Sequence, residues 1–154
     1  PEGLVSFYSM QSKDEYTLII DIGSRTVNYA SFVGGKIESN FTEKIGVLDL
    51  YSSIKDIENA KGNDLIEEQI ERLIKNKRII VEPKVYLDFL KDILNRTKAK
   101  VNIKDYKVVF VGGGAILLKP YIEANTPATI HEDSVYANLI GARRLCEAMW
   151  KRGK

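Results

Sequence analysis

Cysteine and histidine are almost absent from this sequence. Cys146 is the single cysteine of the 154-residue chain, which excludes an internal disulfide and fits a reducing, cytoplasmic location. We expect Cys146 to be buried, because it lies in an apolar stripe of a helix near the end of the chain. His131 is the only histidine, and the sequence offers no partners for a metal or catalytic role, so we interpret it as a loop residue.

An excess of one charge and a long hydrophobic run are also missing. The chain has 23 basic and 21 acidic residues, a net charge of +2, which is too even to predict direct nucleic-acid binding. No apolar run approaches about 18 residues, so we expect no membrane span, and no signal peptide is recognisable. The chain begins Pro1-Glu2 without a methionine, and we expect a fragment or a processed half of a longer protein. A hydrophobic content of 44% supports one domain with a substantial core.

The first informative stretch is Tyr16 to Phe32, YTLIIDIGSRTVNYASF, which predicts strand, tight turn and strand. Gly23 at the tip permits a close approach of a ligand to the backbone, and the turn N–H groups can join the Ser24 and Thr26 hydroxyls to bind an anion. The carboxylate of Asp21 would be repelled by a phosphate unless a divalent cation or a polarised water lay between them. The stretch therefore predicts a metal-assisted phosphate site. The alternative is an ordinary hairpin, with Asp21 and Gly23 present for turn formation only.

A second informative stretch, KVVFVGGGAILL, predicts a buried strand over residues 106–111, a glycine turn, and a helix over 115–124. Gly112, Gly113 and Gly114 remove side chains where a ligand could touch the backbone, at the carboxyl end of a strand where α/β proteins bind ligands. The spacing fits neither the dinucleotide fingerprint nor the P-loop. The alternative is a glycine turn that serves packing alone.

The remaining segments predict a mainly helical middle. A third antiparallel strand is expected over Lys36 to Phe41, and a last short strand over residues 127–130. Helices are expected over residues 4–10, from 45 to 61, from a cap at Asn63 or Asp64 to Lys75, from Pro83 onwards, and from a cap at Ser134. We interpret residues 45–80 as a small helical inserted subdomain. Residues 1–44 and 81–154 would then form the main subdomain.

Taken together, the D-x-G-x-x-T hairpin and the V-G-G-G-A turn about 90 residues later resemble the second half of the actin/Hsp70/sugar-kinase superfamily. The sequence is most similar to the bacterial plasmid-segregation actins of the ParM type, in the segments DIGSRTVNYASF, EKIGVLDLYSSI, VVFVGGGAILLKPYI and SVYANLIGARRL. The resemblance implies an α/β, actin-like ATPase (ribonuclease H-like) domain. It further implies ATP or GTP with Mg²⁺ as ligands, filament formation with copies of itself, a missing N-terminal half, and a DNA-bound adaptor protein, without direct nucleic-acid or membrane contact.

The same resemblance assigns roles to individual residues. Asp21 resembles the catalytic carboxylate that holds magnesium-bound waters, and Glu2 the residue that orients the attacking water. Glu71, with Arg72 or Lys75 behind it, resembles the group that reaches the ribose and the adenine; a solvated helix face is the alternative for Glu71. The remaining cofactor-binding residues are the phosphate cradle of Gly23, Ser24 and Thr26 and the adenosine loop of Gly112, Gly113 and Gly114.

Arg25 and Asn28 depart from the pattern, because many relatives have a small residue and an acid at these places. The helical insertion is short, and the first half of the family's fold is missing. We therefore expect the nucleotide-binding half of an actin-like, filament-forming ATPase for plasmid DNA segregation, with this chain alone inactive. The alternatives are half of a small-molecule kinase of the same superfamily and an isolated, non-catalytic assembly module.

Overall fold

The structure, a computed structural model, describes residues 16–131, 142–144 and 146. Three predictions lie outside these residues: Glu2, the helix over residues 4–10 and the helix start at Ser134. Cys146 is helical but exposed, so the prediction of a buried thiol is wrong. An apolar stripe tells which face of a helix is suited to packing. It does not tell what covers each of its members.

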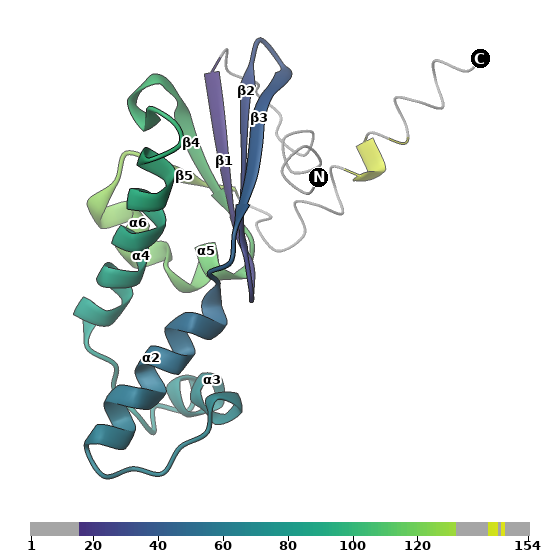
Figure 1. Cartoon of the computed structure of the whole chain (residues 1–154). Coiled ribbons are helices and arrows are strands. Elements are labelled where there is room, and N and C mark those ends of the chain that lie inside the picture. The colour runs from purple at the N-terminus through teal and green to yellow at the C-terminus, as the bar shows by residue number, and fades with distance from the viewer. Residues whose placement is uncertain (1–15, 132–141, 145, 147–154) are drawn as a thin grey trace.

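The described strands form one mixed sheet in the order β3-β2-β1-β4-β5 (Figure 1). Strands β1 (Tyr16–Ile22), β2 (Val27–Val33) and β3 (Lys36–Glu43) form the expected antiparallel meander. Strand β4 (Lys107–Val111) runs parallel to β1, and the short β5 (Thr129–Ile130) runs parallel to β4. The prediction that the apolar strand before the glycine turn is an interior strand is confirmed.

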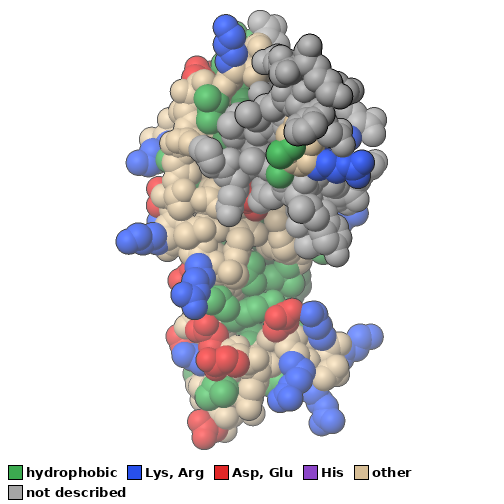
Figure 2. Space-filling model, turned by 90° about the vertical axis from the view of Figure 1, so that its right-hand side faces the viewer, with side chains coloured by type: hydrophobic (Ala, Val, Ile, Leu, Met, Phe, Trp, Pro, Cys, Tyr) green, Lys and Arg blue, Asp and Glu red, His purple; other side chains and the backbone are tan. Residues whose placement is uncertain are grey.

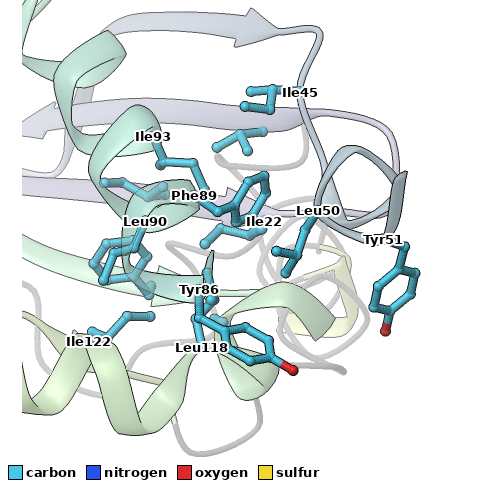
Figure 3. Close-up of a cluster of buried hydrophobic side chains, with 14 of the residues drawn as sticks. Ile22, Ile45, Leu50, Tyr51, Tyr86, Phe89, Leu90, Ile93, Leu118 and Ile122 are labelled. Atoms are coloured by element: carbon cyan, nitrogen blue, oxygen red, sulfur yellow. The ribbon is translucent and has the colours of Figure 1, made fainter. Parts of the chain in front are cut away.

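Helices lie on one side of this sheet and extend past its end (Figure 1). They are α2 (Val47–Ala60), α3 (Glu67–Lys75), α4 (Pro83–Lys98), the 3-10 turn η1 (Ile103–Asp105), α5 (Gly113–Leu117) and α6 (Lys119–Asn125). Their apolar residues join those of one sheet face in a single core (Figure 3). Because side chains alternate along a strand, the other face carries a second buried cluster. This cluster consists of Ile19, Ala30, Phe32, Val109 and Val111.

The start of α3 differs from the prediction. The helix begins at Glu67, not after a cap at Asn63 or Asp64. The Asn63 side chain instead donates a hydrogen bond to Glu58 Oε2 at 3.0 Å, and Lys61 Nζ donates to Glu58 Oε1 at 2.6 Å. Glu58 is only 7% exposed, and a buried carboxylate needs such partners. The side-chain amide of Asn63 therefore binds the buried carboxylate of Glu58 in the preceding helix and does not cap α3.

The helix predicted over residues 115–124 is also wrong in detail, because it is divided into α5 and α6 at Leu118. Pro120 lies in the first turn of α6. Proline lacks an N–H group, and its ring would clash with the carbonyl of residue 116 in a continuous helix. No described helix is long and apolar enough to cross a membrane. The inserted subdomain over residues 45–80 stays a prediction.

Candidate functional site

The turn between β1 and β2 is closed by a short backbone hydrogen bond and fastened to α2. The N–H of Gly23 donates to the carbonyl of Thr26 at 2.9 Å. In α2, the N–H of Val47 donates to the carbonyl of Gly23 at 3.1 Å, and that of Leu48 to the carbonyl of Ser24 at 2.9 Å. Two donors at the start of this helix are therefore occupied by the turn. They hold the turn in place and are not available to an anion.

Gly46 makes this close approach possible, and the sequence analysis missed it. A Cβ atom on Gly46 would lie 2.4 Å from the carbonyl oxygen of Ser24 and 2.6 Å from the backbone nitrogen of Arg25. The Gly46 N–H donates to Asp49 Oδ2 at 2.7 Å, which fixes the entry into α2. The only signal in the sequence is a glycine between two apolar residues at a helix start. Such a glycine can mark a close backbone approach.

Asp21 lies beside the glycine turn. It is 5% exposed and is paired in the sheet with Asn28 of β2 and with Val111 of β4. Gly112 follows Val111 with a φ of +89°, a conformation that favours glycine. A Cβ atom on Gly112 would lie 2.5 Å from Asp21 Oδ1 and 2.7 Å from the carbonyl oxygen of Ile22. The two sequence motifs therefore meet at these residues.

The three glycines have different surroundings. A Cβ atom on Gly114 would lie 2.2 Å from Cγ2 of Ile22, so close packing against β1 requires glycine there, as it does at Gly112. A Cβ atom on Gly113 would have no atom of another segment within 4 Å. Packing explains the outer two glycines of the run. Gly113 instead borders open space.

A cavity of about 430 Å³ opens between the two turns and the helices α2, α3 and α5. Of the residues predicted from the sequence, Gly23, Ser24, Glu71, Gly113 and Gly114 line this cavity. Asp21, Thr26 and Gly112 are not among its lining residues, although Asp21 and Gly112 adjoin the turns that form it. Figure 2 shows hydrophobic side chains gathered at the surface between the sheet and the part that contains α2 and α3. The remaining lining residues are Ile22, Val47, Leu48, Tyr51, Ile74, Lys75, Ile116 and Leu117.

One ion pair and one buried phenol set the electrostatics of the cavity. Lys75 Nζ lies 2.6 Å from Glu71 Oε1, and both side chains are well exposed. Of the two cations considered for a place behind Glu71, Lys75 therefore lies at the cavity, and Arg72 is not among its lining residues. Burial, with the charge of Glu71 adding to it, raises the pKa of Tyr51 to about 12. Tyr51 lies at the edge of the core with its hydroxyl directed away from it (Figure 3).

The apolar walls of the cavity were not predicted, because their pattern is the same as that of core residues. Leu48, Ile74 and Ile116 lie on helices, where apolar residues at helical spacing normally face a core. Such walls with few polar groups are typical of small-molecule sites. Residues 16–131, 142–144 and 146 contain no group of three or more His, Cys, Asp or Glu that could hold a metal. A single carboxylate at Asp21 is nevertheless compatible with Mg²⁺, which keeps several waters and binds through one or two carboxylates and substrate phosphates.

No protein-family model and no curated protein sequence matches this chain. Solved structures do match it, among them an archaeal actin homologue in complex with ADP, with a TM-score of 0.76 and 19% identity over 96% of this chain. MreB 5 of Spiroplasma citri bound to AMPPNP gives a TM-score of 0.76 and 16% identity over 98% of the chain. A non-polymerisable quadruple mutant of the pCBH ParM protein gives 0.75 and 17% identity over 96%. The chain spans only 56%, 59% and 53% of these three proteins, respectively. It therefore has the α/β fold of about one half of an actin-like protein, as the resemblance implied.

Proposed function

We propose that this chain is the nucleotide-binding half of an actin-like protein, with the base and ribose in the 430 Å³ cavity and the phosphates at the β1–β2 turn. One observation carries the proposal. The cavity brings together Ser24, Glu71 and Gly113, which lie far apart in the sequence and were singled out from separate motifs. Two of the similar structures contain ADP or AMPPNP, which supports the same interpretation.

The base would lie between the apolar walls of the cavity. Leu48 and Ile116 offer apolar surface, and Gly113 leaves room next to the backbone. A ring in this position is held by shape and by removal of apolar surface from water. The Glu71 carboxylate can accept hydrogen bonds from ribose hydroxyls, while Lys75 keeps its charge balanced.

The phosphates would lie at the β1–β2 turn. Because the N–H groups of Val47 and Leu48 in α2 and that of Gly23 in the turn are all bound to turn carbonyls, phosphate recognition falls to the Ser24 and Thr26 hydroxyls and to the remaining N–H groups of the turn. Mg²⁺ would neutralise the phosphate charge, with Asp21 holding its waters. Glu2 stays the proposed residue that orients the attacking water; it lies outside the described residues.

In the whole protein, ATP would lie between this half and a second half, and its hydrolysis would destabilise a filament that segregates plasmid DNA through an adaptor protein. This chain alone would leave the phosphates open to water, where a high dielectric constant weakens each ionic contact. We therefore propose weak nucleotide binding and no meaningful turnover by the chain on its own. Half of a small-molecule kinase and a non-catalytic assembly module remain the alternatives. Light scattering with and without ATP separates the filament former from the kinase.

A titration of the ¹⁵N-labelled chain with MgATP, followed by NMR, tests the site directly. We expect the amide signals of Ser24 and Gly113 to shift. A parallel titration with MgGTP shows which base is preferred, because the preferred nucleotide reaches the same shifts at a lower concentration. Gly113→Val should abolish these shifts because its branched side chain fills the open space, whereas Gly113→Ala is the matched small substitution and should keep most of the affinity. Unchanged binding of MgATP to Gly113→Val would refute the proposed base position.

A further inference from the structure

One phenol at the wall of the 430 Å³ cavity has no hydrogen-bond partner in the described part of the chain. Tyr51 lines this cavity from α2 and is only 9% exposed. Its hydroxyl is directed away from the core (Figure 3). Within the described residues, no fully buried side-chain oxygen or nitrogen lacks a partner, so the Tyr51 oxygen is accessible. The hydroxyl is therefore available to a bound molecule or to water.

Other buried phenols differ from Tyr51 in one respect or the other. Tyr29 donates a hydrogen bond to the carbonyl oxygen of Ile93 at 3.5 Å. Tyr86 stacks on Tyr121 with ring centroids 5.0 Å apart, and it is not among the residues that line the cavity. Tyr51 thus combines a buried ring, an unpaired hydroxyl and a place at the cavity wall.

The Tyr51 hydroxyl keeps its proton at neutral pH. Burial, with the charge of Glu71 adding to it, raises the pKa of Tyr51 to about 12. A protonated phenol can donate one hydrogen bond and accept others. Tyr51 and Glu71 line the same cavity from α2 and α3, so a molecule bound there can meet both groups.

Glu71 supplies the complementary acceptor. Its Oε1 accepts a hydrogen bond from Lys75 Nζ at 2.6 Å, and its Oε2 has no hydrogen bond to another described residue. A carboxylate only accepts hydrogen bonds, whereas the phenol also donates them. The negative charge of Glu71 repels a phosphate. The pair therefore suits an uncharged group with neighbouring donors and acceptors, such as the two adjacent hydroxyls of a ribose.

We propose that Tyr51 is a specificity-determining residue that contacts the ribose and, together with Glu71, selects ribonucleotides over deoxyribonucleotides; this inference rests on the proposed nucleotide site. The Tyr51 hydroxyl donates to one ribose oxygen, and Glu71 accepts a hydrogen bond from the neighbouring ribose hydroxyl. A deoxyribonucleotide leaves one of these two protein groups without its partner. A site that binds a ligand hydroxyl disfavours an analogue that lacks it for this reason.

The accessibility of the Tyr51 oxygen limits the size of the effect. Loss of one hydrogen bond between uncharged groups corresponds to roughly a 2–10-fold change in affinity. Water can reach this oxygen and replaces part of the missing contact, so the discrimination stays far below that of an enclosed site. Because no described protein group binds the hydroxyl, Tyr51→Phe should keep the fold at neutral pH.

Titrations of the ¹⁵N-labelled 154-residue chain with the magnesium complexes of ATP, 2′-deoxy-ATP and 3′-deoxy-ATP test the contact. The unchanged chain should bind MgATP roughly 2–10-fold more tightly than the analogue without the hydroxyl that Tyr51 contacts. Tyr51→Phe should weaken MgATP binding by a similar factor and leave the affinity for that analogue unchanged. Tyr86→Phe is the matched control, because it removes the same group from a buried ring of α4 outside the cavity. It should leave all three affinities unchanged.

Several results would overturn the contact while nucleotide binding itself persists. One is equal affinity of the unchanged chain for MgATP and both analogues, and another is full MgATP affinity in Tyr51→Phe. An equal loss for all three nucleotides in Tyr51→Phe would show that the phenol acts through packing. An altered preference between MgATP and MgGTP with unaltered sugar discrimination would place the hydroxyl at the base.

The proposed function fails on a different result. If MgATP shifts no amide signal of the unchanged chain, the nucleotide site is refuted, and the ribose contact is refuted with it. If MgATP shifts the signals of Ser24 and Gly113 but the sugar makes no difference, only the role of Tyr51 is refuted.

Discussion

Alanine substitution at each glycine of the Gly112-Gly113-Gly114 run should give three different stabilities. At Gly112, a φ of +89° with a ψ of 169° lies in a region that is essentially restricted to glycine and costs an alanine roughly 1–3 kcal/mol, and a Cβ atom 2.5 Å from Asp21 Oδ1 adds an overpacking cost of roughly 1–3 kcal/mol. At Gly114, the 2.2 Å approach to Ile22 costs a similar roughly 1–3 kcal/mol, offset in part by the higher helix propensity of alanine. At Gly113, nothing lies within 4 Å, and alanine should be neutral or stabilise by up to about 1 kcal/mol.

Urea unfolding followed by far-UV circular dichroism measures these differences, with the slope of the transition as a check on two-state behaviour. For a chain of this size, each kcal/mol corresponds to about 2–4 °C in Tm. The order of stability should be Gly113→Ala first, then Gly114→Ala, with Gly112→Ala last. A Gly113→Ala variant as unstable as Gly114→Ala would refute the distinction between packing glycines and an open one. A Gly112→Ala variant within about 0.5 kcal/mol of the unchanged chain would refute the close approach to Asp21.

Three further predictions concern the same site. In the whole protein that contains this chain, Asp21→Ala should reduce phosphate release by about 10²-fold or more while much of the nucleotide affinity remains. A loss of only a few-fold would contradict the role of Asp21. Glu71→Gln should change the free energy of unfolding by less than about 1 kcal/mol, because the ion pair of Glu71 with Lys75 is exposed. The same substitution should lower nucleotide affinity. An affinity equal to that of the unchanged chain would show that Glu71 belongs to a solvated helix face. The pKa of Tyr51 is raised from 10.0 to about 12, so the contribution of this phenol to the free energy of unfolding is fully present below pH 10 and is lost as the pH rises through 12. Tyr51→Phe should flatten this alkaline loss in Tm relative to the unchanged chain, and an identical pH profile would contradict the burial of the phenol.

Local rules were sufficient for the three antiparallel strands and for the interior character of β4, but not for the parallel pairing of β4 with β1. The β-formers of Tyr16 to Ile20 and Val27 to Phe32 flank a tight turn, and the short loop allows only an antiparallel hairpin. The strand before Gly112 was recognisable as interior because its residues after Lys107 are all apolar, whereas a strand with one solvated face alternates. The break at Pro120 also follows from a local rule. The continuous helix predicted there ignored that rule.

Other features depend on which segments contact one another in the folded chain, and the sequence of a single segment does not reveal its contacts. Gly46 matters because α2 begins against the β1–β2 turn, and nothing near Gly46 in the sequence names Ser24 as its neighbour. Asn63 is a good cap by composition, yet the buried Glu58 competes for its amide. The apolar residue Leu48 fits a core stripe equally well whether a protein segment or a ligand covers it.

Packing and ligand binding, the two interpretations of the glycine run, are not alternatives in this structure. Gly112 and Gly114 let β4 and α5 approach Asp21 and Ile22 closely, and this approach is what places Gly113 across the cavity from the β1–β2 turn. A substitution at either outer glycine would therefore disturb the fold and the cavity together, and a loss of binding there would not identify a ligand contact. Gly113 borders the cavity without a packing constraint. It is the position of the run at which binding and stability can change independently.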